Sequence, residues 1–203
     1  NRGLEVKWNA FSRVDTINKD LLRRMKQVGC YGLVFGVESG NQEILDTVKK
    51  KITLKKVTQA VALTKETGMR AVTSFILGLP GETKKTMRQS YDFAKQLNAP
   101  YCLHVLAPFP GTEVREKADE YGITILTDDW SKYDANRAVT TTPGAGAKEV
   151  QEILHEYYSD VRRFDRAQEE LERQGKLSAE DIGEKRRRRG QRFAWSLLKN
   201  DCI

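Results

Sequence analysis

The 203-residue sequence lacks several features that mark common classes of protein. No apolar run reaches the roughly 18 residues that a membrane-spanning helix needs, and no signal peptide opens the chain, so we expect a cytoplasmic protein. The three cysteines, Cys30, Cys102 and Cys202, lie too far apart to indicate a disulfide framework or a close-spaced metal motif. We therefore expect buried thiols in a reducing compartment.

Familiar catalytic signatures are also missing. The sequence contains neither the Gly-Lys-Ser/Thr ending of a phosphate-binding loop nor a Gly-x-Gly-x-x-Gly fingerprint, a His-Glu-x-x-His motif or a Ser-His-Asp order. His104 lies within an apolar run and is expected to be a core histidine, while His155 lies in a charged helical segment without a visible catalytic partner. An ordinary enzyme with a complete site of its own is therefore disfavoured.

Charge is present but unevenly placed. The net charge is +7, and six basic residues near the C-terminus carry most of it, which leaves +1 for the rest of the chain. These residues are Lys185, Arg186, Arg187, Arg188, Arg189 and Arg192. A near-neutral body with a basic tail is expected, and any affinity for polyanions belongs to that tail.

Strand-like and helix-like segments alternate four times. Apolar runs at 6–11, 31–37, 70–77 and 101–107 predict strands, and helical periodicity follows at 18–28, 42–50, 53–68, 83–97 and 113–121. Asn18, Thr53 and Thr83 are expected to cap helices. Near-continuous apolar strands predict an α/β fold with a parallel sheet covered by helices. Four units could form an open sheet, or part of a barrel whose first strands lie upstream of Asn1.

Composition suggests three regions. Residues 1–122 contain the strand–helix units, 123–147 form a polar connecting or lid-like segment, and 148–203 form charged C-terminal helices with the basic tail. The last region is predicted to hold one amphipathic helix at 148–174 and another at 179–198.

Glycine-containing turns follow three of the predicted strands. In Phe-Gly-Val-Glu-Ser-Gly (35–40), Glu38 stands at a strand end, where its carboxylate could hold a ribose or an amino acid, or could instead stabilise the next helix N-terminus. Both interpretations remain open. In Phe-Ile-Leu-Gly-Leu-Pro-Gly-Glu-Thr (75–83), an apolar ledge at Ile76 and Leu77 suits a flat ring such as adenine. Because carboxyl ends of parallel strands share one edge, that edge is the expected ligand site.

Four motifs in order resemble the radical S-adenosylmethionine (SAM) superfamily: Arg-Val-Asp (13–15), the two motifs above, and Pro-Phe-Pro-Gly-Thr (108–112). The resemblance covers about residues 1–135 and is greatest to a branch that often carries an upstream cobalamin-binding domain. It implies a partial TIM-type barrel holding the third to sixth of six βα units. The family's CxxxCxxC motif is absent here, so the first two units are expected upstream of Asn1.

The resemblance also implies an activity and its cofactors. Family members bind a [4Fe–4S] cluster through that motif and cleave SAM reductively to methionine and a 5′-deoxyadenosyl radical. This chain is thus expected to be the C-terminal part of such an enzyme and inactive alone, because it lacks the cluster cysteines. The substrate is open, and cobalamin-dependent methyl transfer and tRNA or cofactor modification are both compatible with the resemblance.

Nine residues match cofactor-binding positions of the family, and none matches a catalytic or metal-ligating one. Glu38 and Ser39 match the strand-end pair that faces the cofactor. Lys50 matches a basic position that contacts the carboxylate of the cofactor, and Ser74 matches a strand position that contacts its ribose. The remaining matches are Ile76 and Gly78 near adenine, Leu106 and Ala107 through their backbone against adenine, and Arg13 near the methionine part.

The basic tail supports a hypothesis from another class. The cluster from Lys185 to Arg189 is followed by Phe193 and Trp195, and cations beside aromatic rings can contact phosphates and stack bases. The alternative functions are therefore a nucleic-acid-binding module and, more simply, a solvated basic helix end.

Overall fold

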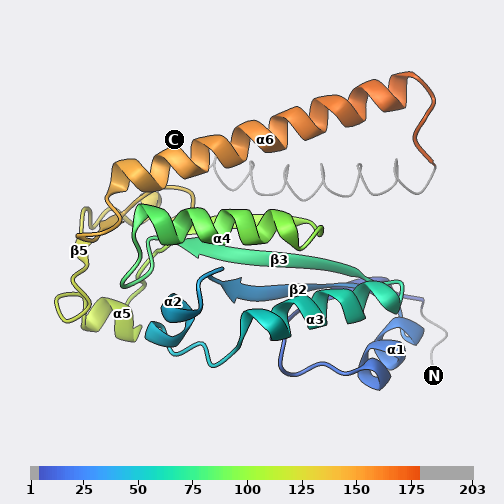
Figure 1. Ribbon diagram of the computed structural model, residues 1–203, viewed down its shortest axis with the longest axis horizontal. Helices are drawn as coiled ribbons and strands as arrows, with labels where there is room; N and C mark the ends of the chain where they lie inside the picture. The colour runs from blue at the N-terminus through green and yellow to red at the C-terminus, as the bar shows by residue number, and fades with distance from the viewer. Residues whose placement is uncertain (1–4, 179–203) are drawn as a thin grey trace. The chain divides into compact units, whose positions relative to one another are not determined.

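Four parallel strands in the order β1-β2-β3-β4 form one sheet in the computed structural model, which describes residues 5–178 (Figure 1). The strands are β1 (Trp8–Ser12), β2 (Cys30–Glu38), β3 (Arg70–Leu77) and β4 (Tyr101–Val105). Each strand pairs with the next one along the chain. The predicted α/β fold with a parallel sheet is confirmed.

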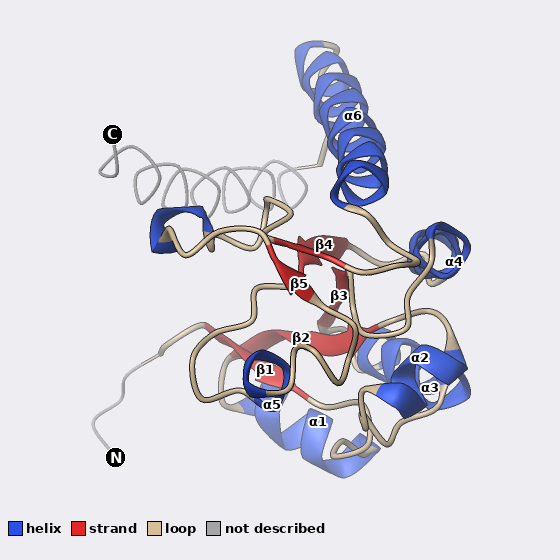
Figure 2. Ribbon diagram, turned by 90° about the vertical axis from the view of Figure 1, so that its left-hand side faces the viewer, coloured by secondary structure: helices blue, strands red, loops and turns tan. Residues whose placement is uncertain are grey.

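The helices α1 (Lys19–Gln27), α3 (Leu54–Glu66) and α4 (Lys84–Gln96) follow strands β1, β2 and β3, with the short α2 (Gln42–Thr47) preceding α3. Figure 2, which looks onto the carboxyl ends of the strands, shows these helices along one side of a curved sheet. The three predicted caps are confirmed, because the side chains of Asn18, Thr53 and Thr83 each accept a hydrogen bond from a backbone N–H of the first turn.

Burial alternates along the central strands, as in the partial barrel that the family resemblance implied and unlike an open sheet covered by helices on both faces. Phe35 in β2 and Phe75 in β3 are fully buried beneath the helices, whereas Val34 and Val72, which lie on the opposite face, are only partly buried. Phe11 of β1 is 87% exposed. Among the described residues, helices therefore cover only one face of the sheet.

Several elements differ from the predicted boundaries. Helix α2 ends at Thr47 rather than 50, β4 ends at Val105, and α5 spans only Glu113–Glu116. In the predicted connecting segment, β5 (Thr124–Ile125) pairs antiparallel with β6 (Thr140–Thr141), and the short 3₁₀ helix η1 (Trp130–Lys132) lies between them in sequence.

The long helix α6 (Ala147–Arg173) confirms the predicted amphipathic helix. The chain divides into two compact units after Leu154, and the first unit includes the connecting segment and the start of α6, where Val150, Ile153 and Leu154 are buried. The predicted helix at 179–198 and the basic cluster lie outside the described residues. No helix within residues 5–178 combines the length and apolarity that crossing a bilayer requires.

Candidate functional site

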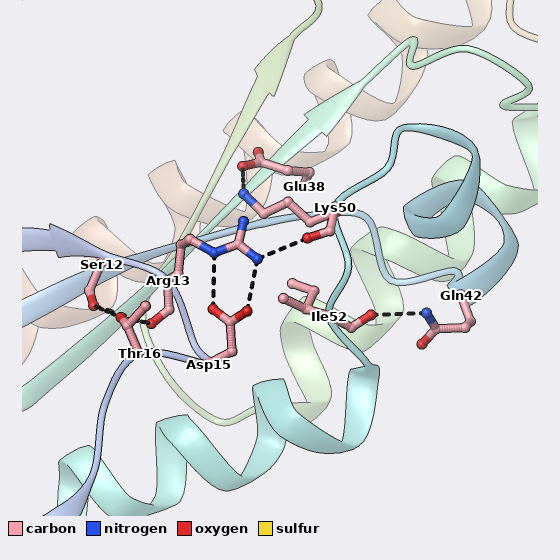
Figure 3. A network of polar contacts seen from close by, with 8 residues as sticks. All are labelled: Ser12, Arg13, Asp15, Thr16, Glu38, Gln42, Lys50 and Ile52. Carbon is pink, nitrogen blue, oxygen red and sulfur yellow. Dashed lines mark hydrogen bonds and ion pairs between the residues drawn. The ribbon is translucent and has the colours of Figure 1, made fainter.

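The carboxyl end of β2 carries a partly buried ion pair. Glu38 is the last residue of the strand, and its Oε1 accepts a hydrogen bond from Lys50 Nζ at 2.7 Å (Figure 3). Both side chains are about one-fifth exposed. Partial burial strengthens a charge pair relative to one in open solvent, so this pair is better placed to hold a polar ligand than a surface salt bridge is.

The backbone around this ion pair adopts left-handed conformations that residues other than glycine rarely take. Glu38, Lys49 and Lys51 have positive φ angles of 72°, 54° and 57°. Such conformations cost on the order of 1 kcal/mol or more each for non-glycine residues, and they concentrate at functional sites. The turn through Lys49 and Lys51 is what ends α2 early and directs Lys50 toward β2.

The ion pair occupies the space that a side chain at Gly36 would fill. A Cβ atom at Gly36 would lie 2.7 Å from Glu38 Oε1 and 3.3 Å from Lys50 Nζ. Gly36 pairs in register with Ser74 of β3, so the ion pair lies over the face of the sheet that Ser74 shares. That face is the less buried one described above.

Arg13 and Asp15 extend the polar network beyond β1. Arg13 donates from Nε to Asp15 Oδ1 at 3.0 Å and from Nη2 to Asp15 Oδ2 at 2.8 Å, and Nη2 also reaches the Lys50 carbonyl oxygen at 3.0 Å (Figure 3). The hydrogen bond to Arg13 is the main cause that lowers the pKa of Asp15. The structure thus brings the Arg13 side chain to the backbone of Lys50, and three of its hydrogen bonds are already made within the protein.

Ser39 lies next to Glu38 in sequence but serves another contact. Its side chain is fully buried, and its Oγ is 3.0 Å from Ser90 Oγ in α4. Ser90 Oγ also accepts the Gly40 N–H at 2.9 Å. The hydroxyl of Ser39 therefore ties the end of β2 to α4, and the structure does not bring it to the ion pair.

Ser74 and Ile76 lie on the same face of β3, both partly buried. The hydroxyl of Ser74 makes no hydrogen bond within the described part of the chain. Ile76 packs against a buried apolar cluster made up of Ile44, Leu79, Leu106 and Ile123. Its register partner His104 is half-buried, and burial lowers the pKa of its imidazole, with Glu38 opposing the shift.

The turn after β3 is closed by a buried carboxyl group. Glu82, 1% exposed, accepts the backbone N–H groups of Gly78 and Leu79 on Oε2 at 2.8 and 3.0 Å. Burial raises the pKa of Glu82 to about 8. Gly78 has a φ of 82°, which its missing side chain permits, and its N–H is occupied by Glu82.

The backbone predicted to lie against adenine follows β4. Leu106 is buried and donates its N–H to the Leu77 carbonyl at 2.9 Å, and Ala107 follows it, partly exposed. The predicted positions on β3 and after β4 are therefore neighbours at one edge. Within residues 5–178, no group of three or more His, Cys, Asp or Glu side chains could hold a metal ion.

Three residues of the site were missed by sequence reasoning. Gly36, Asp15 and Glu82 all stand inside motifs that the sequence highlights, yet none was assigned a role. Their positions inside these motifs were the one indication in the sequence that they belong to the site. Their roles depend on contacts across the fold, namely with Lys50, Arg13 and the turn at Gly78.

Comparison with known proteins places the chain in a family. The family model described as "Radical SAM superfamily" matches residues 1–94. An uncharacterized methyltransferase of Pyrococcus horikoshii is 34% identical over 77% of this chain and 34% of its own length. The anaerobic magnesium-protoporphyrin IX monomethyl ester cyclase of Rubrivivax gelatinosus is 30% identical over 80% of this chain and 29% of its own length.

A solved structure supports the fold. The radical SAM methyltransferase TsrM from Kitasatospora setae, with cobalamin and a [4Fe–4S] cluster bound, superposes with a TM-score of 0.52 at 22% identity, covering 61% of this chain and 26% of that one. The chain thus spans about a third of the length of the curated relatives it matches. With four sequence motifs, a matching family model and this fold, the chain belongs to the radical SAM superfamily.

Proposed function

We propose that this chain forms the part of a radical SAM enzyme that holds the nucleoside and amino-acid portions of SAM at the carboxyl ends of its strands. The observation that carries the proposal is the Glu38–Lys50 ion pair, set by strained backbone over an open sheet face. Family membership supports it, since SAM is the cofactor that the superfamily shares.

The residues present fit this cofactor chemically. Glu38 uses Oε1 for Lys50, and its second oxygen is available to accept from an ammonium or hydroxyl group. The Lys50 ammonium has three donors, so it can bind a carboxylate while keeping Glu38. Ser74 offers a hydroxyl for a ribose, and the half-buried Ile76 offers an apolar surface for a base.

The residues present do not fit an iron–sulfur cluster. The three cysteines of the chain have no CxxxCxxC spacing. We propose that the cluster ligands come from outside these 203 residues and that the chain alone does not cleave SAM. When bound to the cofactor, a [4Fe–4S] cluster supplies the electron for its reductive cleavage. The role of this chain is to bind and orient the organic part of the cofactor.

We propose cobalamin-dependent methyl transfer as the reaction class. One is named an uncharacterized methyltransferase, and another, from Streptomyces wedmorensis, a cytidylyl-2-hydroxyethylphosphonate methyltransferase, 25% identical over 74% of this chain. The TsrM structure that shares the fold contains cobalamin. The cyclase relatives catalyse a different reaction by name, so product analysis must decide between the two classes.

The test uses the full-length protein, purified without oxygen and reconstituted with iron and sulfide. SAM and a strong reductant are added with and without methylcobalamin, and the nucleoside products are separated. We expect 5′-deoxyadenosine and methionine to form. A protein with a complete cluster that releases neither product would contradict the proposal, and a product pattern that does not depend on methylcobalamin would exclude cobalamin-dependent methyl transfer.

Nucleic-acid binding by the segment from Lys185 to Arg189 stays a prediction, because these residues lie outside the described part of the chain. It is tested by measuring RNA affinity with and without residues 184–203. An affinity that ignores both the truncation and the salt concentration would exclude it.

A further inference from the structure

We propose that Asp15 is a positioning residue for the cofactor site, acting through Arg13 on the peptide group that follows Lys50. The proposal rests on the proposed function, because its effect is read in the binding of SAM. Asp15 itself lies in the loop after β1, and nothing in the network has it touching Glu38 or Lys50 directly (Figure 3).

Asp15 fixes the orientation of the Arg13 guanidinium. The two side chains form a fork of parallel hydrogen bonds at 3.0 and 2.8 Å, and this bidentate geometry restrains a planar guanidinium more strongly than a single contact does. The Asp15 side chain is 24% exposed and the Arg13 side chain 44%, so the carboxylate side of the fork is partly shielded from water and the guanidinium side is open to it. In this orientation, Nη2 donates its further hydrogen bond to the Lys50 carbonyl.

The Lys50 carbonyl belongs to the peptide group between Lys50 and Lys51, which is the strained part of the turn. Residues Lys49 and Lys51 on either side have positive φ angles. Two further hydrogen bonds hold the turn. The Lys50 N–H donates to the Leu45 carbonyl oxygen at 2.9 Å, and Gln42 Nε2 donates to the Ile52 carbonyl oxygen at 3.0 Å. Arg13 adds a contact from the loop after β1, and this contact restrains the direction in which the Lys50 side chain leaves the turn.

Loss of Asp15 thus removes the restraint on Arg13 and loosens the turn at Lys50. A looser turn weakens the Glu38–Lys50 pair, and this reduces the affinity for SAM.

Equilibrium binding of SAM to the full-length, reconstituted protein tests the proposal with four variants: Asp15→Asn, Lys50→Gln, the double variant, and Asp20→Asn. Asp20 pairs with Arg23 on exposed α1 and provides the same chemical change away from the site. Hydrogen exchange in the segment 46–53 without ligand is measured in parallel. Thermal unfolding confirms that each variant is folded.

We expect Asp15→Asn to weaken binding about tenfold, as loss of a hydrogen bond to a charged group does. The double variant should bind no more weakly than Lys50→Gln, because Asp15 acts through Lys50. Exchange in 46–53 should be faster in Asp15→Asn than in Asp20→Asn. Wild-type-like binding and exchange in Asp15→Asn, or additive losses in the double variant, would overturn the proposal. A wild-type protein that does not bind SAM contradicts the proposed function instead, while the exchange result still tests the role of Asp15.

Discussion

Gly36 supports the ion pair, since its missing side chain leaves room for Glu38 and Lys50. The atoms nearest to a methyl group there belong to the tips of these two side chains, which can move at little cost to the fold. We expect Gly36→Ala to change the free energy of unfolding by less than about 1 kcal/mol. It should weaken SAM binding about tenfold, because displaced charges lose hydrogen bonds to the ligand.

Gly32, four residues earlier in β2, is the matched control. A Cβ there would lie 3.0 Å from the Arg70 carbonyl oxygen, which is backbone and cannot move freely. Gly32→Ala should therefore lower stability more than affinity, measured by denaturant unfolding and SAM titration. If Gly36→Ala instead lowered stability and left binding intact, the space over Gly36 would have no role in the site.

Glu82 makes the stability of the protein depend on pH. Its folded-state pKa of about 8 lies above the ordinary value of 4.5. At pH values between these two, the folded protein therefore binds more protons than the unfolded chain. The contribution of Glu82 to the free energy of unfolding should fall by on the order of 3–5 kcal/mol as the pH rises from about 4.5 to about 8. Chemical denaturation at several pH values measures the change.

Glu82→Gln should remove most of this pH dependence, because the amide stays neutral and keeps an acceptor for the Gly78 and Leu79 N–H groups. The exposed Glu66 at the end of α3 is the control, and Glu66→Gln should leave the wild-type profile unchanged. An unchanged slope in Glu82→Gln would show that the buried carboxyl group does not take up a proton in this range.

At the scale of elements, the end of β2 is fixed to α4 by the buried hydroxyls of Ser39 and Ser90. Ser90→Ala would leave the Gly40 N–H without this acceptor. We expect a loss of roughly 1–3 kcal/mol in the free energy of unfolding, the usual cost of an unsatisfied buried donor. Thr58→Ala removes an exposed hydroxyl of α3 and should cost less than about 0.5 kcal/mol. Equal effects of the two changes would contradict the anchoring role.

Elements were predictable where the signal is local. The caps at Asn18, Thr53 and Thr83 and the four strands follow from short sequence patterns, and the structure confirms them. The early end of α2 was not predictable, because Lys49 and Lys51 adopt left-handed conformations that no local rule favours for lysine. Contacts from Arg13 and Gln42, distant in sequence, hold the turn there.

At the scale of the whole molecule, family resemblance assigned cofactor contacts to more residues than residue patterns did, and these assignments stay predictions. The position of Glu38 alone left two interpretations open, and a run of three lysines such as Lys49–Lys51 is usually the solvated end of a helix. In the structure, Lys49 binds Glu113 and Lys50 binds Glu38, both at 2.7 Å. Two neighbouring lysines thus form ion pairs of equal length that differ in their exposure to solvent. The sequence does not show which of the two pairs is partly buried, because that depends on the fold.

These two ion pairs allow the most direct test of the cofactor site. SAM binding is measured by equilibrium titration of the full-length, anaerobically reconstituted protein as wild type, Glu38→Gln and Glu113→Gln. The Glu113 pair has the same length but is about half exposed, so its loss controls for the removed charge. We predict at least a tenfold loss of affinity in Glu38→Gln, because a charged hydrogen bond to the ligand is lost, and no loss in Glu113→Gln. Equal affinities of all three proteins would contradict a SAM site at Glu38.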